Sequence, residues 1–99
     1  MIDLARIEGF DWDAGNARKN ERHGVTQAEA EQAFFDPSLL VAPDLSHSAA
    51  EPRFHALGTT VAGRLLHVTF TLRFQGTKIR VISARDMSRK EEVFYEQKT

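Results

Sequence analysis

The chain has 99 residues, of which 41% are hydrophobic and 27% charged, which is typical of one globular domain over residues 1–99. It contains no cysteine, which excludes disulfide scaffolds, thiolate zinc sites and cysteine nucleophiles. The formal net charge of −1 excludes a polycation that coats nucleic acid or membranes along its whole length. The sequence has no apolar run of about 18 residues and no signal-peptide pattern, so we expect a cytoplasmic protein without membrane contact.

The charges are distributed unevenly along the chain. Residues 1–52 carry 4 basic and 10 acidic side chains, a net charge of −6, whereas residues 53–99 carry 9 basic and 4 acidic side chains, a net charge of +5. The positive half indicates a surface for phosphate. The acidic half is either an ordinary solvated surface or a docking surface for a basic partner.

The first half of the chain predicts two helices. Asp13 is placed to cap a polar helix over about residues 14–23. Thr26 and Glu29 have the spacing of a capping box, in which each side chain binds the backbone of the other residue. This motif predicts the beginning of a second helix over about residues 27–35.

The second half changes to the alternating pattern of a sheet. A short strand is predicted at 39–41, and a loop containing proline then leads to a meander of three strands. These strands are predicted over about residues 53–60, 64–74 and 78–85. A second capping box at Ser88 and Glu91 begins a helix to about residue 97. The order predicts an α+β fold, a mostly antiparallel sheet with two N-terminal helices and one C-terminal helix packed on one face.

Alternation in the middle strand of this meander separates two faces of the sheet. The side chains expected to pack against the helices are Leu66, Val68, Phe70 and Leu72. The side chains expected on the opposite, open face are His67, Thr69, Thr71 and Arg73, joined from the neighbouring strands by Arg53, His55, Lys78 and Arg80. In the last strand, either a bulge or the end of the strand would decide whether Ile82, or Ser83 with Arg85, points outward.

The open face is a candidate surface for phosphate, because residues 53–90 contain eight basic residues and one acidic residue. Each basic residue or histidine of this face also has an alternative interpretation, in which its role is structural and not functional. Arginines on exposed strands often only keep a sheet soluble. His55 and His67 are candidates for acid–base groups, metal ligands or ordinary polar surface residues, and His47 has the same alternatives. We predict no metal site.

Several motifs resemble the BrnT toxins of bacterial type II toxin–antitoxin pairs. In the first half they are Phe10-Asp11-Trp12-Asp13, Asn20, Arg22-His23-Gly24-Val25, Glu29-Ala30 and Phe34-x-Asp36-Pro37. In the second half they are His47-Ser48, Glu51-x-Arg53-Phe54, Gly58, Gly63-Arg64-x-Leu66, Thr71-x-Arg73, Ile79-Arg80-Val81-Ile82-Ser83-Ala84-Arg85, Glu91 or Glu92, and Tyr95. The resemblance covers about residues 10–96. Family members often carry lysine where this chain has Asn16, so an RNA contact of that lysine is either absent here or supplied by Arg18 or Lys19.

The resemblance implies a RelE-like fold and an endoribonuclease that arrests growth by cutting RNA without a metal or other cofactor. It also implies a cognate ribbon-helix-helix antitoxin of the BrnA type, a heterotetrameric complex, and contact with operator DNA only through the antitoxin. Two other functions are compatible with the residues: a non-catalytic module that binds nucleic acid or an operator, and a partner-binding module.

RNA cleavage of this kind requires a base for the 2′-hydroxyl, an acid for the leaving 5′-oxygen and cations for the phosphorane charge. The candidate catalytic residues are Arg53, Arg80 and Arg85 for phosphate charge, His55 or His67 for a proton, and Tyr95. The candidate RNA-binding residues are Lys19, Arg64, Arg73 and Lys78, and the candidate supporting residues are Glu51 and Ser83. Arg85 has a structural alternative, an ion pair with Glu91 or Glu92.

Overall fold

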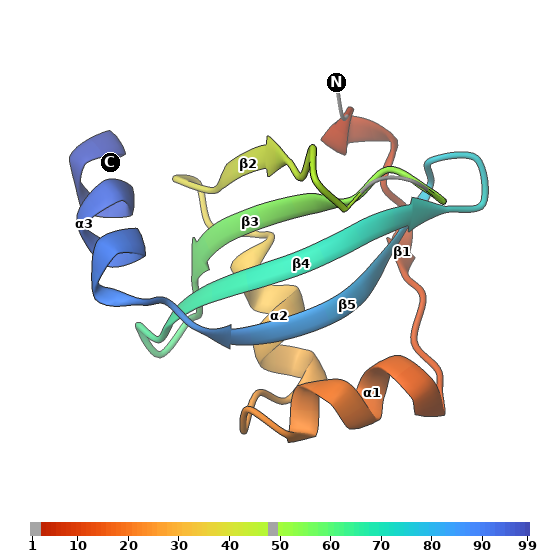
Figure 1. Ribbon diagram of the computed structural model, residues 1–99, viewed down its shortest axis with the longest axis horizontal. Coiled ribbons are helices and arrows are strands. Elements are labelled where there is room, and N and C mark those ends of the chain that lie inside the picture. The colour runs from red at the N-terminus through yellow and green to blue at the C-terminus, as the bar shows by residue number, and fades with distance from the viewer. Residues whose placement is uncertain (1–2, 48–49) are drawn as a thin grey trace.

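In the computed structural model, which describes residues 3–47 and 50–99 except for the side chain of Asn20, five strands form one mixed sheet (Figure 1). The strands are β1 (Gly9–Phe10), β2 (Leu40–Pro43), β3 (Phe54–Thr59), β4 (Leu65–Arg73) and β5 (Lys78–Asp86). Their order across the sheet is β1-β5-β4-β3-β2, with β1 parallel to β5 and the other pairs antiparallel. Ser48, which belongs to one of the motifs above, lies outside the described residues.

The three α-helices begin where the sequence predicts, whereas a short N-terminal 3₁₀-helix was not predicted. The helices are a 3₁₀-helix over Leu4–Arg6 and three α-helices, α1 (Ala14–Glu21), α2 (Gln27–Ala33) and α3 (Arg89–Lys98). Both predicted capping boxes are present, with reciprocal bonds at the beginning of α2 and of α3. The turn after α1 has Gly24 at a φ of 67°, a backbone conformation that glycine adopts without steric cost. The predicted α+β fold is confirmed.

Helix α2 covers the face of the sheet that carries the predicted apolar residues. Ala30 and Ala33 are fully buried against it. On β3, a Cβ atom at Gly58 would overlap the carbonyl oxygen of Ala33, so only glycine allows this close approach. The ring of Phe34 meets that of Phe70 edge-on, with 5.0 Å between centroids. The core therefore lies between α2 and the sheet.

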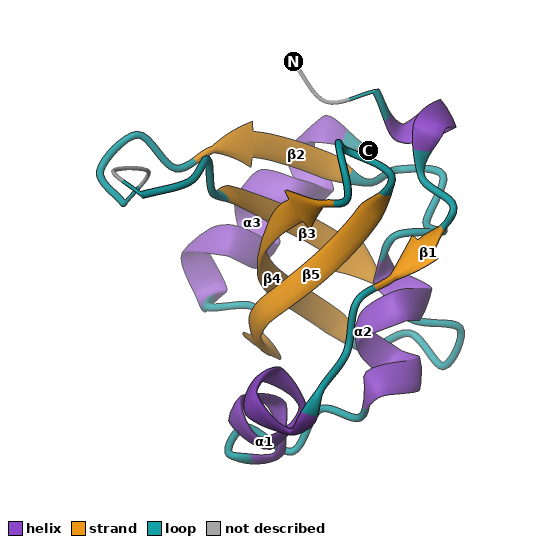
Figure 2. Cartoon of the chain, turned by 90° about the vertical axis from the view of Figure 1, so that its right-hand side faces the viewer, coloured by secondary structure: helices purple, strands orange, loops and turns teal. Residues whose placement is uncertain are grey.

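The other two α-helices lie at the rims of the sheet (Figures 1 and 2). Helix α1 runs beside β5, where the Asn16 amide donates to the Val81 carbonyl oxygen at 2.9 Å. Helix α3 reaches the face opposite α2, because Tyr95 accepts a hydrogen bond from the Thr59 hydroxyl at 2.9 Å, and Thr59 alternates with Gly58 along β3. The expected packing of all three helices on one face thus holds for α2, whereas α1 follows an edge and α3 contacts the other face.

A β-bulge in β5 determines which side chains of this strand point to the open face, a question that the sequence left undecided. Thr69 of β4 pairs with Ser83, and the next residue of β4 pairs with Val81, so Ile82 is the extra residue. The bulge allows Val81 and Ala84 to be fully buried in the core, although they are three residues apart. Arg85 consequently lies on the open face, the face that carries Thr69.

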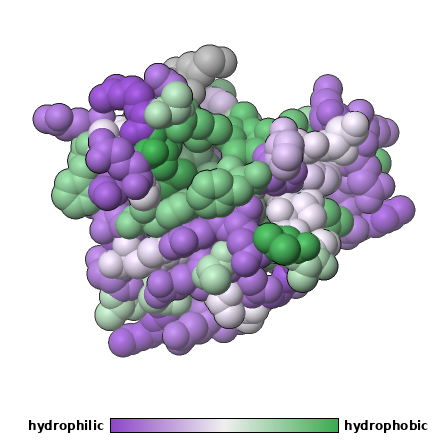
Figure 3. Space-filling view, turned by 180° about the vertical axis from the view of Figure 1, so that it is seen from behind, coloured by the Kyte–Doolittle hydropathy of each residue, from purple (hydrophilic) through white to green (hydrophobic). Residues whose placement is uncertain are grey.

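A hollow of about 390 Å³ lies on the side opposite the open face. It is lined by Leu4, Ile7, Glu8, Gly9, Phe10, Phe34, Phe35 and Ile79. Apolar side chains gather around it in the view from behind (Figure 3), and Phe35 is 75% exposed. In the described part of the chain, no helix is both long enough and apolar enough to cross a membrane.

Candidate functional site

A groove of about 270 Å³ lies between α1 and the open face of the sheet. Its lining residues are Gly15, Asn16, Lys19, Glu51, Arg53, Arg73, Arg80 and Ile82. Four of these are basic and one is acidic, so we call it the basic groove. The fold thus brings together five of the predicted site residues from four separate parts of the chain: Lys19, Glu51, Arg53, Arg73 and Arg80.

Carboxylates hold two of the groove arginines in place. The guanidinium of Arg80 lies 3.2 Å from a carboxylate oxygen of Asp11 and 3.0 Å from one of Asp13. That of Arg73 lies 3.0 Å from Glu51. The hydrogen bond from Arg80 lowers the pKa of Asp13, so this carboxylate is ionised at neutral pH. The pairs orient both arginines and partly neutralise their charge.

Asn16 is buried in the wall of the groove, and only 4% of it is exposed. Its amide oxygen accepts from the Asp13 backbone N–H at 2.7 Å, and its amide nitrogen donates to the Asp11 and Val81 carbonyl oxygens at 3.0 and 2.9 Å. A lysine ammonium has no acceptor atom for the first of these bonds. Lys19, one helical turn later, lines the groove; it is one of the two residues considered above as a substitute for a lysine at position 16.

A second polar group, which we call the histidine row, lies beside the groove and consists of Asp44, His55, Thr69 and His67. His55 of β3 pairs with Thr69 of β4, and its ring centroid lies 4.8 Å from that of His67. The His55 Nε2 atom lies 3.0 Å from Asp44 Oδ2, and its Nδ1 atom lies 3.0 Å from Thr69 Oγ1. Both ring nitrogens of His55 are therefore engaged.

Asp44 is absent from the residues predicted from sequence. It is only 8% exposed, and its carboxylate accepts from the Ser46 backbone and hydroxyl at 3.1 and 3.0 Å. Burial opposes ionisation, but the Ser46 hydroxyl and the charges of His47 and His55 lower the pKa of Asp44 to about 2. The available sequence signal was local, since Asp followed two residues later by Ser is typical of a side-chain turn.

Arg85 and Glu91 lie at the His67 end of the histidine row. Arg85 donates two hydrogen bonds to the Glu91 carboxylate, at 2.8 and 3.0 Å, which is the structural pair considered above. The pair lowers the pKa of Glu91 to about 2. A Glu91 oxygen also lies 3.8 Å from His67 Nε2. Burial, aided by the Arg85 charge, lowers the pKa of His67, so this ring is neutral at pH 7.

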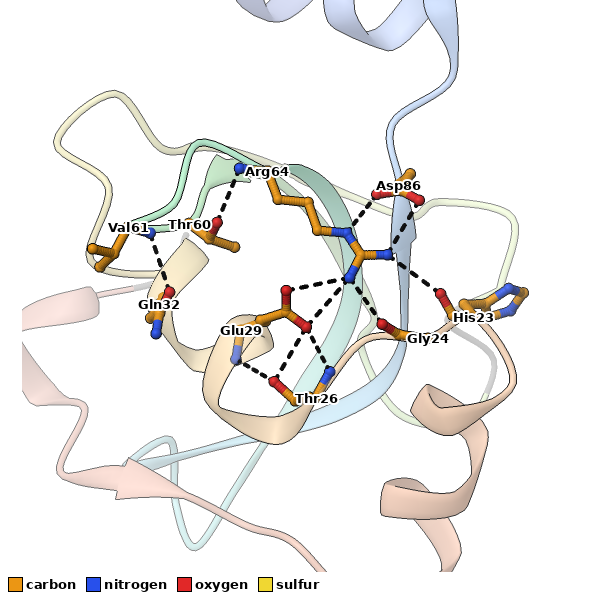
Figure 4. A network of polar contacts seen from close by, with 9 residues as sticks. All are labelled: His23, Gly24, Thr26, Glu29, Gln32, Thr60, Val61, Arg64 and Asp86. Atoms are coloured by element: carbon orange, nitrogen blue, oxygen red, sulfur yellow. Dashed lines mark hydrogen bonds and ion pairs between the residues drawn. The ribbon is translucent and has the colours of Figure 1, made fainter.

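Arg64 lies apart from this surface, in the network of Figure 4. Its guanidinium binds the Asp86 carboxylate at 2.7 and 3.2 Å and both Glu29 oxygens at 3.3 Å. It also donates to the carbonyl oxygens of Gly24 at 2.8 Å and His23 at 3.4 Å. These contacts join the end of α1, the beginning of α2 and the end of β5.

Three further predicted residues lie around or beyond the groove and the histidine row. Tyr95 is buried between Thr59 and the Asp36 carboxylate, to which it donates, and burial together with the Asp36 hydrogen bond raises the pKa of Tyr95. The Lys78 ammonium lies beside Gly9 of β1. Ser83 pairs with Thr69 and is thus next to the histidine row.

Among the described residues, no group of three or more His, Cys, Asp or Glu side chains is arranged to hold a metal ion. A family model described as "Ribonuclease toxin, BrnT, of type II toxin-antitoxin system" matches residues 12–91. The chain belongs to the BrnT toxin family. The segment that matches BrnT includes the whole basic groove and histidine row, while Tyr95 lies beyond it. The family assignment implies RNA as the substrate and an antitoxin as a partner. No curated protein matches the chain.

Proposed function

We propose that this BrnT-family chain is a metal-independent endoribonuclease that arrests growth in the cytoplasm by cleaving RNA bound across the basic groove and the histidine row. The observation that carries the proposal is their adjacency. Arg53 directly precedes β3 and lines the groove, and His55, two residues later on the same face, belongs to the histidine row. Phosphate-binding cations and proton-transfer groups therefore lie side by side, as cleavage requires.

In the proposed reaction the RNA 2′-oxygen attacks the adjacent phosphorus, and the bond to the 5′-oxygen breaks. Arg53 and Arg80 stabilise the negative charge that develops on the phosphorane. The histidine rings supply the proton-transfer group. Arg85, held by Glu91, extends the positive surface beyond His67. Lys19, Arg73 and Lys78 bind flanking phosphates, and Glu51 orients Arg73.

The test is incubation of the purified chain with single-stranded RNA in excess EDTA. We expect fragments with 2′,3′-cyclic phosphate and 5′-hydroxyl ends. The variant Arg53→Ala should lower the cleavage rate at least tenfold, while Lys98→Ala on α3 should cleave as the wild type does. Cleavage that requires a divalent cation would refute metal independence. RNA that is bound with steep salt dependence but stays intact would favour the non-catalytic nucleic-acid-binding alternative.

We infer that the antitoxin is a ribbon-helix-helix protein of the BrnA type, that the complex is a heterotetramer, and that operator DNA is bound through the antitoxin. The family assignment supports the presence of an antitoxin partner, because the matching family is the toxin of a type II toxin–antitoxin system. Co-expression with the product of a short adjacent reading frame should yield a complex whose mass corresponds to two copies of each chain. A 1:1 complex, or operator binding by this chain alone, would contradict the inference.

A further inference from the structure

Asp44, His55 and Thr69 form one continuous chain of hydrogen bonds that ends on the open face. The distances are 3.0 Å from the Asp44 carboxylate to His55 Nε2 and 3.0 Å from His55 Nδ1 to the Thr69 hydroxyl. An ionised carboxylate only accepts, so Nε2 carries the ring proton. In the neutral ring Nδ1 is then the acceptor, and Thr69 donates to it. A carboxylate, an imidazole and a hydroxyl in this order are the arrangement by which proteins activate hydroxyl groups.

The buried end of this chain is firmly held. The Asp44 carboxylate also accepts from the backbone N–H groups of Ser46 and His47, at 3.1 and 3.2 Å. A buried carboxylate of this kind is stable only when several donors compensate for lost hydration. The buried Asp44 carboxylate therefore fixes the orientation of the His55 ring. An ordinary polar histidine on the surface needs no such buried partner.

The exposed end of the chain lies at the β-bulge. Thr69 is partly exposed and sits where the β4–β5 register shifts at Ile82, and Ile82 lines the basic groove. Because both nitrogens of His55 are engaged, the hydrogen-bonded route from this ring to the open face runs through the Thr69 hydroxyl. Arg53 and Arg80 line the same groove as Ile82, so cations for a phosphate lie near this end of the chain.

We propose that Asp44, His55 and Thr69 are a proton relay that activates the RNA 2′-hydroxyl, with Thr69 as the residue that touches the substrate and Asp44 as a positioning residue. The proposal rests on the proposed ribonuclease function. The 2′-hydroxyl proton passes to Thr69 Oγ1 while the Thr69 proton passes to His55 Nδ1. The 2′-oxygen bonds to phosphorus, the bond from phosphorus to the 5′-oxygen breaks, and this oxygen takes a proton from solvent. The imidazolium beside Asp44 afterwards returns its proton to solvent.

The test compares two substitutions at position 69 that differ in the hydroxyl group. Thr69→Val keeps the shape of the side chain and removes the hydroxyl, so we expect kcat for RNA cleavage to fall about 100-fold with KM within twofold of the wild type. Thr69→Ser keeps the hydroxyl and should retain at least a third of the wild-type kcat. Asp44→Asn should lower kcat at least tenfold, again with little change in KM.

The matched control is His47→Ala, because His47 also contacts the Asp44 carboxylate, at 3.2 Å, but lies outside the relay. It should keep wild-type kcat, and circular dichroism should show that every variant is folded. Equal loss in Thr69→Val and Thr69→Ser, or wild-type kcat in Thr69→Val, would overturn the relay. If Arg53→Ala still lowers the cleavage rate at least tenfold in that case, the proposed ribonuclease function stands without the relay. A wild-type chain that leaves RNA intact would overturn both.

Discussion

Asn16 links the beginning of α1 to the sheet with three hydrogen bonds, to Asp13, Asp11 and Val81. All three go to backbone groups, two of them at the point where the chain leaves β1 and enters the helix. Helix α1 is too polar to be held by apolar packing alone. One buried amide therefore contributes to the attachment between α1 and β5, together with the Arg80–Asp13 ion pair, and α1 in turn carries Lys19 into the basic groove.

We expect Asn16→Ala to lower the free energy of unfolding by about 2 kcal/mol, because two carbonyl oxygens and one N–H lose a buried partner. Urea denaturation followed by circular dichroism measures this. Arg18→Ala, an exposed position on the same helix, should change the free energy of unfolding by less than about 0.5 kcal/mol. Equal stability of the Asn16→Ala variant and the wild type would show that α1 is held by other contacts.

The two capping boxes were predictable because their partners lie three residues apart, so the spacing alone carries the geometry. Asp44 was not predictable, because its contact with His55 joins two residues that are distant in the sequence, across a loop and a strand pairing. The contacts of Arg64 were not predictable for the same reason, because its partners are distant in the sequence. Its place in the sequence suggested an RNA contact, whereas the fold surrounds it with carboxylates and carbonyl oxygens from three distant segments.

At the level of elements, the bulge in β5 determines which side chains reach the open face. A regular strand would place Arg80 and Arg85 on opposite faces, since five residues separate them. The extra residue Ile82 places both on one face, while Val81 and Ala84 remain in the core. Four of the five strands in the described chain, and the polar face of the sheet, followed from the sequence pattern, whereas the two-residue β1 did not. The bulge did not, because it depends on how β5 packs against β4 and α2.

Arg64 joins three elements, so its removal should reduce stability more than RNA binding. We expect Arg64→Ala to lower the free energy of unfolding by about 1–3 kcal/mol, because Asp86, Glu29 and the Gly24 carbonyl each lose the Arg64 donor. Affinity for a non-cleavable 2′-O-methyl RNA should stay within twofold of the wild type. Thermal unfolding measures the change in stability, and fluorescence anisotropy measures the affinity for RNA. Weakened RNA binding with unchanged stability would place Arg64 in the RNA surface after all.

Helix α3 is tied to the sheet through Glu91, and this attachment should depend on pH. The pKa of Glu91 is lowered from an ordinary value of 4.5 to about 2 by its hydrogen bonds with Arg85. A carboxyl whose pKa is lower in the folded state stabilises the fold above its ordinary pKa, and loses this contribution as the pH falls toward the folded value. The free energy of unfolding should therefore decline between about pH 4.5 and pH 2.

Glu91→Gln should show a shallower decline over this interval, because the side chain no longer titrates. Urea denaturation at a series of pH values measures the slope. Glu96→Gln, an exposed position on the same helix, is the control and should follow the wild type. A Glu91→Gln slope equal to that of the wild type would mean that the pair with Arg85 contributes nothing to stability.

For the whole molecule, the fold mixes the two oppositely charged halves of the sequence. Arginines of the second half pair with acidic residues of the first: Arg80 with Asp11 and Asp13, Arg64 with Glu29, and Arg73 with Glu51. The interpretation of the halves as two separate surfaces is thus corrected by the structure. Much of the positive charge of residues 53–99 is neutralised within the chain, and the basic groove is one place where cationic side chains gather around an open space.

This distribution predicts a moderate salt dependence of RNA binding. If all nine basic residues of the second half met phosphate, log K would fall with log salt concentration with a slope of about −6 for single-stranded RNA. The five cations proposed to bind phosphate, the four of the basic groove and Lys78, give about −3.5. We expect the smaller value for a short 2′-O-methyl RNA, measured by fluorescence anisotropy between 50 and 300 mM KCl. Lys19→Ala should reduce the slope by about 0.7, and Lys98→Ala on α3 should leave it unchanged. A slope near −6, or a slope insensitive to Lys19, would place the RNA outside the groove.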